Sequence, residues 1–191
     1  MERKKIDKET ILCRAAQMVN ASDGQSLSMK LLAEDLGIQS PSLYYYFKNL
    51  DDLKRELMLY GWRQMEAVLL HSMVGISGYE ALKSMCYAFF HYATQNPGVF
   101  NIMLWYNQYE NDESKTAISR VFSALIKIME RENISETNAN HLLRTFRGFL
   151  QGFSQLVNHG AFGNPLSIED SFELSLNVII EGIKSLEEKH Q

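Results

Sequence analysis

Apolar positions recur every three or four residues along most of the chain, and no stretch shows the strict alternation that a half-buried strand requires. The first such segment is 7–20, where one helical face is formed by Ile11, Leu12, Ala15, Ala16 and Val19. A second, short helix is expected to begin after the cap Ser28 and to end at Gly37. The pattern therefore predicts an all-α protein.

Four aromatic residues follow one another in the third expected helix, Tyr44, Tyr45, Tyr46 and Phe47. Ser40 is its expected cap and Pro41 its first helical residue. At 3.6 residues per turn the four rings point in different directions, so Leu43 and Phe47 are expected to be buried and the three tyrosines to face something other than the core. A fourth helix is expected after the cap Asn49, with an apolar stripe at Leu53, Leu57, Met65, Val68 and Leu69.

Two short helices joined by Gly37-Ile38-Gln39 match a helix-turn-helix, whose second helix enters the major groove of DNA. Tyrosine suits that position, because its ring packs against sugars and thymine methyls while its hydroxyl bonds a phosphate. The alternative is that the tyrosines only bridge to a neighbouring helix.

Residues 11–53 resemble the DNA-binding domain of the TetR family of bacterial transcription regulators. The matching positions are Ile11, Ala15-Ala16, Gly24, Leu32-Ala33, Leu36-Gly37-Ile38, Leu43-Tyr44, Phe47-Lys48-Asn49 and Asp52-Leu53. The resemblance implies an all-helical homodimer of about nine helices per chain, which most often represses transcription and leaves DNA when a small molecule binds. It also implies a DNA-binding domain at 1–55 and a ligand-binding and dimerisation domain at 56–191.

Carried over to this chain, the resemblance assigns DNA contacts to nine residues. Ser28 and Lys30 are expected to contact phosphate. The residues expected to face base edges are Gln39, Ser40, Ser42 and Tyr44, and those expected to grip the backbone are Tyr45, Tyr46 and Lys48. Gln39 is the best reader, because a carboxamide can bond adenine on two atoms. Leu50 stands where the family often has a lysine, which weakens one phosphate contact.

The C-terminal part resembles the family in architecture alone, with breaks at 96–98, 111–112, Asn133 and 158–160 and a cap at Ser167. Two late segments carry coiled-coil-like seams that fit the four-helix dimer interface of TetR-like proteins. The expected interface residues are Phe146, Phe153, Leu156, Phe172, Leu176, Ile179 and Ile183. Gly148 and Gly152 permit a close helix crossing. A purely intramolecular helix pair is the alternative.

Aromatic residues crowd 87–109 beyond what one stripe can bury, so they are expected to line a cavity for a small, largely apolar ligand. The expected ligand residues are Phe89, Phe90, His91, Met103, Trp105, Arg147 and Phe149, with Arg144 and Gln151 as further polar candidates. A bulky core is the alternative.

Charge and cysteine content place limits on this picture. Residues 1–55 carry nine Lys/Arg against eight Asp/Glu, and 56–191 carry ten against fifteen, so only the N-terminal part is slightly basic. Arg3, Lys4 and Lys5 contribute to that charge, although such a cluster is more often a solvated tail. Cys13 and Cys86 are expected to be buried thiols, and the absence of a signal or membrane segment predicts a cytoplasmic protein.

Motifs for catalysis are absent: there is no phosphate-binding glycine loop, no paired-cysteine or H-E-x-x-H metal spacing, and no serine elbow. The sequence therefore predicts a non-enzymatic regulator with no cofactor and no metal, whose partners are operator DNA, a small effector and a second copy of the chain. Two alternatives remain, a TetR-like protein that acts mainly through protein contacts and a small helical enzyme that uses His91 with a carboxylate.

Overall fold

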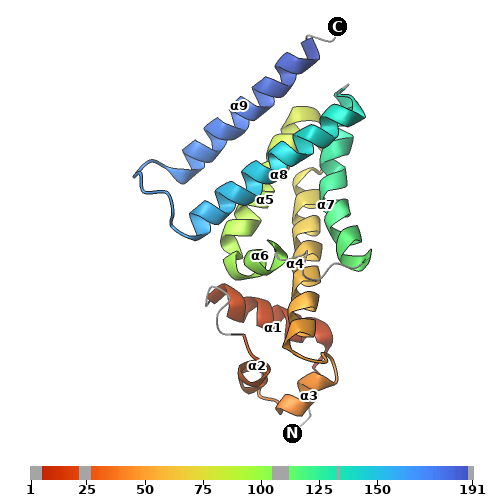
Figure 1. Cartoon of the computed structure of the whole chain (residues 1–191), viewed down its shortest axis with the longest axis vertical. Helices are drawn as coiled ribbons and strands as arrows, with labels where there is room; N and C mark the ends of the chain where they lie inside the picture. The colour runs from red at the N-terminus through yellow and green to blue at the C-terminus, as the bar shows by residue number, and fades with distance from the viewer. Residues whose placement is uncertain (1–5, 22–26, 105–111, 133, 189–191) are drawn as a thin grey trace. The chain divides into compact units, whose positions relative to one another are not determined.

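The computed structural model describes residues 6–21, 27–104, 112–132 and 134–188. Every regular element within these ranges is a helix, as the sequence predicts (Figure 1). In chain order they are α1 (Lys8–Ala21), α2 (Met29–Asp35), α3 (Ser40–Tyr44), α4 (Leu50–Ser72), α5 (Gly78–Gln95), α6 (Pro97–Leu104), α7 (Asp112–Arg131), α8 (Glu136–Asn158) and α9 (Ile168–Glu188). Across the described ranges, none of these helices has the length and apolar character needed to cross a membrane.

The chain divides into two compact units. Unit 1 comprises 1–64 and 96–117, and unit 2 comprises 65–95 and 118–191. Unit 1 thus holds the expected helix-turn-helix and also α6, which lies far away in the sequence. The domain boundary between residues 55 and 56, which separates the predicted DNA-binding domain from the predicted ligand-binding and dimerisation domain, stays a prediction.

The first two helices begin and end where the sequence predicts. Asp7 caps α1, because its Oδ1 accepts the Thr10 N–H at 2.8 Å, and the five apolar positions predicted for its inner face are all buried. Ser28 caps α2 by accepting the Leu31 N–H at 3.1 Å. After α2 the backbone turns at Gly37, whose φ of 66° is a conformation that glycine adopts without steric cost.

The third helix differs from the prediction at its start. Its N-cap is Gln39 and its first residue is Ser40, so the expected Ser40 cap is wrong by one position. Proline at the second position satisfies the turn without a serine cap, because it has no N–H that needs a partner. Leu43 and Phe47 are buried as predicted.

The fourth helix begins after the cap Asn49 as predicted, with the Asp52 N–H donating to Asn49 Oδ1 at 2.9 Å. Leu53, Leu57, Met65 and Leu69 are buried along it, whereas Val68 is 41% exposed. Assigning Val68 to the buried stripe was therefore wrong, because the stripe drifts around the helix over its 23 residues.

Helix α6 is held tightly inside unit 1. A Cβ atom on Gly98 would lie 2.1 Å from the Val19 carbonyl oxygen, so the α6 backbone runs directly against the end of α1. Asn20 completes the junction, with its Oδ1 accepting the Val99 N–H and its Nδ2 donating to Asn96 Oδ1, both at 3.0 Å. The break predicted at 96–98 is thus the start of α6, and Asn20 of α1 caps that start.

Unit 2 has an aromatic core between α5, α8 and α9. Phe172 of α9 stacks on Phe90 of α5 at a centroid distance of 4.3 Å and on Phe149 of α8 at 5.2 Å. Phe153 meets both Phe90 and Phe172 edge-on. Helix α5 therefore shares one ring cluster with α8 and α9, which lie much later in the sequence.

This core corrects part of the predicted dimer interface. Phe146, Phe172 and Leu176 are 0% exposed and Ile183 is 2% exposed in a single chain. A partner cannot reach side chains that their own subunit already covers, so these four form the subunit core. Two predicted helix ends are confirmed in this region. The chain breaks at 158–160, where α8 ends, and Ser167 caps α9 by accepting the Asp170 N–H at 3.1 Å.

Candidate nucleic-acid interface

A buried scaffold supports α2 and α3. Leu32, Ala33, Leu43 and Phe47 are each at most 1% exposed, so the inner faces of both helices are fully occupied. On the outer side Arg14 of α1 forms two hydrogen bonds with the Asp35 carboxylate at the end of α2. These contacts hold α2 and α3 in fixed positions, so the polar side chains on their outer faces also have defined positions.

Five of the predicted DNA-contacting residues are exposed in and around α3. Tyr44 and Tyr45 are 54% and 85% exposed, and Ser42 and Lys48 are exposed as well. Gln39 is exposed and makes no capping bond with its side chain, which leaves the carboxamide available to a base edge. Ser40 is half-buried and has the weakest access of the predicted readers.

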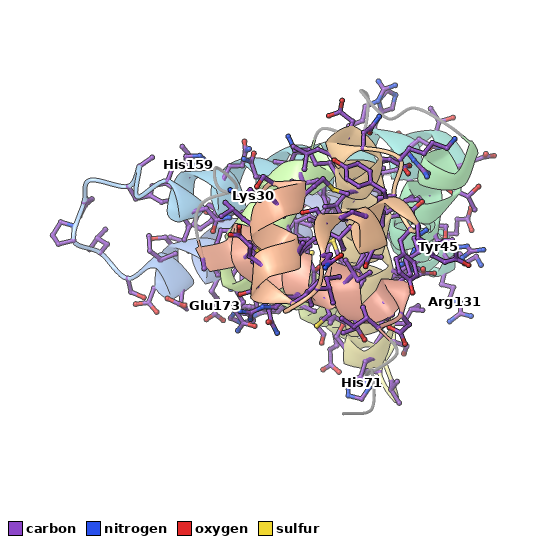
Figure 2. All side chains as sticks on the ribbon, turned by 90° about the horizontal axis from the view of Figure 1, so that it is seen from below. Lys30, Tyr45, His71, Arg131, His159 and Glu173 are labelled. Atoms are coloured by element: carbon purple, nitrogen blue, oxygen red, sulfur yellow. The ribbon has the colours of Figure 1, made fainter. Side chains whose placement is uncertain are left out.

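The predicted phosphate contacts on α2 are compatible with their surroundings. The Ser28 oxygen accepts a backbone N–H, which leaves the hydroxyl proton free to donate. The Lys30 side chain is 79% exposed and lies 3.8 Å from Glu34, a loose surface pair. Lys30 and Tyr45 both reach the surface of unit 1 (Figure 2).

Tyr46 has a different role from the one expected. Its hydroxyl donates to the Ile6 carbonyl at 2.5 Å, and its ring is half-buried. Tyrosine has one O–H and phosphate oxygens only accept, so this hydroxyl cannot donate to a phosphate while it bonds Ile6. We therefore correct the assignment of Tyr46 from a backbone-gripping residue to an internal anchor.

The start of α4 presents Lys48 next to a reinforced cap. The Lys48 N–H donates to Asp52 Oδ2 at 2.9 Å, while Arg55 binds the other oxygen at 3.2 Å. The hydrogen bond from the Lys48 N–H is the main cause that lowers the pKa of the Asp52 carboxyl below its ordinary value, and Arg55 lowers it further. The Lys48 ammonium is exposed and is thus free for a DNA phosphate.

The predicted ligand residues do not form one site. Phe89 and Phe90 are buried in unit 2, and Phe149 is half-buried in its ring cluster. Met103 is buried in unit 1, His91 is exposed and lies beside the Tyr87 ring, and Arg147 lies over the Phe122 ring at 5.3 Å. Trp105 lies outside the described residues.

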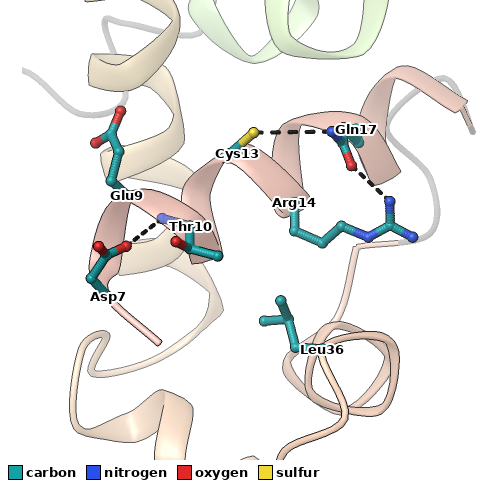
Figure 3. Close-up of a pocket in the computed structure, with 7 residues that line it drawn as sticks. All are labelled: Asp7, Glu9, Thr10, Cys13, Arg14, Gln17 and Leu36. Carbon is teal, nitrogen blue, oxygen red and sulfur yellow. Dashed lines mark hydrogen bonds between the residues drawn. The ribbon is translucent and has the colours of Figure 1, made fainter. Parts of the chain in front are cut away.

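The groove in Figure 3 is formed by α1 and the end of α2, with a volume of about 430 Å³. It is lined by Asp7, Glu9, Thr10, Cys13, Arg14, Gln17 and Leu36, none of which was predicted to bind a ligand. Cys13 is exposed here, so its assignment as a buried thiol was wrong, whereas Cys86 is buried. Burial raises the pKa of the Cys86 thiol.

Two polar groups of α8 are enclosed without partners among the described residues, the Gln151 Nε2 and the Ser154 Oγ. Ser154 is 0% exposed and continues the buried stripe of Phe146 and Leu150. Ser154 is not among the residues predicted to form a site, although a serine four residues after Leu150 in an apolar stripe is a usable signal.

A different face of α8 and α9 is open. Leu156 is 46%, Leu174 66% and Val178 65% exposed. Within the described residues nothing lies within 4 Å of a Cβ position on Gly148 or Gly152, so none of the described helices makes the close crossing that these glycines permit. Small and apolar residues thus recur every four residues on both helices, and no other described part of the chain covers them.

The family assignment follows from comparison with known proteins. The model of the tetracyclin repressor-like C-terminal domain matches residues 82–179, more than half of the 191 residues. The chain belongs to the TetR family of transcriptional regulators. Its helix-turn-helix and the helical domain that follows are the two parts of that fold.

Individual relatives agree with the family. The uncharacterized HTH-type transcriptional regulator YobS of Bacillus subtilis (strain 168) is 23% identical over 93% of both chains. The crystal structure of a possible TetR family regulator from Streptomyces coelicolor A3(2) has a TM-score of 0.74 at 15% identity and covers 94% of this chain and 100% of that one. A TetR variant from Acinetobacter baumannii AYE, solved in complex with minocycline, has a TM-score of 0.70 at 20% identity, covering 96% and 99%.

Proposed function

We propose that this TetR-family regulator binds a near-palindromic operator as a homodimer, represses transcription, and is released by a small, largely apolar ligand. The observation that carries the DNA-binding part is the exposed set of Gln39, Tyr44 and Lys48 on a scaffold that is fully buried. A rigid support matters because base contacts depend on the position of a few side chains. Lys48 supplies affinity for phosphate, and Gln39 supplies sequence readout.

The homodimer is supported by the open face of α8 and α9. We assign the interface to Gly148, Gly152 and Leu156 of α8 together with Leu174 and Val178 of α9. Leu156 belongs to both the first predicted interface and this one. Phe153 and Ile179 are half-buried, and we place them at the margin of the interface. Glycines allow a partner helix to approach closely, and burial of the exposed aliphatic side chains stabilises the pair.

The ligand is proposed to bind in the ring cluster of unit 2. Because Phe172 lies only 4.3 Å from Phe90 between ring centroids, a ligand has to separate these rings before it can enter. The unpaired Gln151 Nε2 and Ser154 Oγ would then meet its polar atoms. The Acinetobacter relative, which was solved in complex with minocycline, supports a ligand-binding role for this chain.

The DNA-binding proposal is tested by selection from a pool of random duplexes with the full-length protein. We expect a two-fold-related sequence to be enriched, with half-sites about one helical turn, or a small multiple, apart. The enriched duplex should bind at least about 1,000 times more tightly than a shuffled duplex at the same salt concentration, on the order of specific-to-nonspecific ratios. Recovery of no common sequence would contradict the proposal.

A further inference from the structure

A stripe of polar residues runs along one side of α8. Its members follow one another at spacings of four, three and four residues, so they share one helical face, and they are Arg147, Gln151, Ser154 and Asn158. At the end of α8 the Asn158 Nδ2 donates to the Ala93 carbonyl of α5 at 3.1 Å. About three turns earlier, Arg147 Cζ lies 5.3 Å from the centroid of the Phe122 ring of α7. The stripe therefore contacts neighbouring helices of unit 2 at both ends.

The two middle members of the stripe hold polar atoms that are enclosed but not bonded. Among the described residues, neither Gln151 Nε2 nor Ser154 Oγ has a hydrogen-bond partner, and Ser154 is 0% exposed. A buried donor without an acceptor has lost its bonds to water and gained none in return, which raises the free energy of the protein without ligand. An acceptor brought to this place by a ligand therefore gains two hydrogen bonds that the protein alone does not make.

Arg147 adds a positive charge one turn before Gln151. The guanidinium keeps this charge at every physiological pH, and its N–H groups can only donate, as can the Gln151 Nε2. The Ser154 hydroxyl can donate as well. A carboxylate only accepts and carries one negative charge, so it matches a set of donors that includes a cation. The nearby cation also offsets part of the cost of bringing a carboxylate out of water.

The other end of the ligand is set by the rings beside the stripe. Phe153 directly precedes Ser154 in α8, and its ring meets both Phe90 and Phe172 edge-on. A ligand that separates Phe172 from Phe90 breaks a stacked pair with a centroid distance of 4.3 Å. An aromatic ring can take the place of either partner in such a stack, whereas an aliphatic chain cannot. The surroundings therefore favour an aromatic body with one acidic group.

We propose that the effector of this protein is an aromatic monocarboxylate, whose carboxylate is bound by Arg147, Gln151 and Ser154 and whose ring enters between Phe90 and Phe172. This inference rests on the proposed function, which includes a small, largely apolar ligand in unit 2, and it names the polar group of that ligand. Gln151 and Ser154 are the residues that an apolar ligand without an acceptor leaves unsatisfied.

Isothermal titration calorimetry with the full-length protein tests the chemical class. The probes are naphthoate, cinnamate and phenylacetate, each paired with its primary carboxamide, which has nearly the same shape but no charge. We expect at least one carboxylate to bind, and to bind at least about tenfold more tightly than its carboxamide, because hydrogen bonds to an ionised group are the stronger ones. Equal affinities within every pair, tighter binding of the carboxamides, or no binding of any carboxylate would overturn the proposal.

Three variants test the residues. Arg147→Gln should weaken the best carboxylate by at least about tenfold and leave its carboxamide nearly unchanged, so that the preference within the pair is lost. Gln151→Leu and Ser154→Ala should each weaken the carboxylate by about three- to tenfold, as for one hydrogen bond. Arg131→Gln is the matched control, because it makes the same substitution at an exposed arginine of α7, and it should bind like wild type.

Circular dichroism melts of each variant without ligand separate a binding role from a folding role. Ser154→Ala removes only a hydroxyl that has no partner among the described residues, so it keeps the test valid even if Arg147→Gln unfolds. Carboxylate affinity that is unchanged in a folded Ser154→Ala and a folded Gln151→Leu would place the carboxylate elsewhere and overturn the site.

Release of the selected duplex, followed by fluorescence anisotropy, connects the site to regulation. The best carboxylate should release the duplex from wild type, and about tenfold more of it should be needed with Arg147→Gln. Release by the carboxamides but not by the carboxylates overturns this inference and leaves the proposed function intact. A wild-type chain that selects no duplex overturns the proposed DNA binding, while calorimetry still measures the carboxylate site, so the two failures are distinguishable.

Discussion

Asn49 and Asp52 cap the start of α4 together. Asn49 Oδ1 accepts the Asp52 N–H, and Asp52 Oδ2 accepts the Lys48 N–H, both at 2.9 Å. Two N–H groups that would otherwise lack partners at a helix start are thereby satisfied, and Lys48 is tied to the first turn of α4. The pair therefore links the position of one proposed phosphate contact to the stability of α4.

The first prediction follows from the lowered pKa of Asp52, which the Lys48 N–H causes in the main. A carboxyl with a depressed folded pKa stabilises the fold above its unfolded pKa of about 3.9, and this stabilisation is lost as the pH falls through the folded pKa. We expect the melting temperature of wild type to drop more steeply below about pH 4 than that of Asp52→Asn. Parallel pH profiles of the two proteins would contradict this.

The second prediction concerns the close approach of α6 to α1. In Gly98→Ala the new methyl group meets the Val19 backbone, which cannot move away, so we expect a loss of about 2 kcal/mol or more in the free energy of unfolding. Gly61→Ala is the matched comparison, because its methyl group meets the Met103 and Val99 side chains rather than a backbone segment. Urea denaturation should show Gly98→Ala as the more damaging change, and the reverse order would argue against the tight α1–α6 junction.

The third prediction separates the dimer interface from the subunit core. Leu174→Glu/Val178→Glu places charges at sites that are exposed in the subunit, so the variant should fold and sediment as a monomer. Val74→Glu is the control, since Val74 is 75% exposed but belongs to the turn between α4 and α5, and it should stay dimeric. Analytical ultracentrifugation measures the oligomeric state, and circular dichroism measures whether the variant is folded. A double variant that remains dimeric would rule out this face.

The fourth prediction compares two serines, one inside α8 and one at its start. Ser154→Ala removes a buried hydroxyl that has no partner in the described residues, so stability without ligand should be unchanged or higher. Ser135→Ala removes the N-cap that accepts the Asn138 N–H and should cost about 1 kcal/mol. Thermal melting of the two variants compares these stability changes. A loss for Ser154→Ala as large as that for Ser135→Ala would show that the Ser154 hydroxyl already has a hydrogen-bond partner.

The sequence predicts the helix-turn-helix well because its signals are local. The cap at Ser28, the turn at Gly37 and the spacing of Leu43 and Phe47 depend on neighbouring residues alone, and the structure confirms each. The dimer seam could not be predicted in the same way. Periodicity shows that a face of α9 is apolar, but it does not show whether the subunit or a partner covers Phe172.

Two other differences also have long-range causes. Tyr46 was expected at the DNA because its neighbours suit that position, whereas its hydroxyl bonds Ile6, which no local pattern reveals. The aromatic excess of 87–109 suggested a cavity, yet the rings of α5 pack on Phe149 and Phe172 from far along the chain. Composition predicts how much apolar surface must be buried, and only the tertiary contacts decide where.

The central claim, that the face of α2 and α3 reads DNA, is tested most directly by titrating Gln39→Ala and Lys48→Ala against the selected duplex and a shuffled one over a range of salt concentrations. Lys48→Ala should weaken binding to both duplexes alike and lower the salt slope by about one, as for a single phosphate. Gln39→Ala should leave the slope and the shuffled duplex unchanged, while losing about 1 to 3 kcal/mol on the selected one. Equal losses on both duplexes for Gln39→Ala, or no loss for Lys48→Ala, would contradict the account.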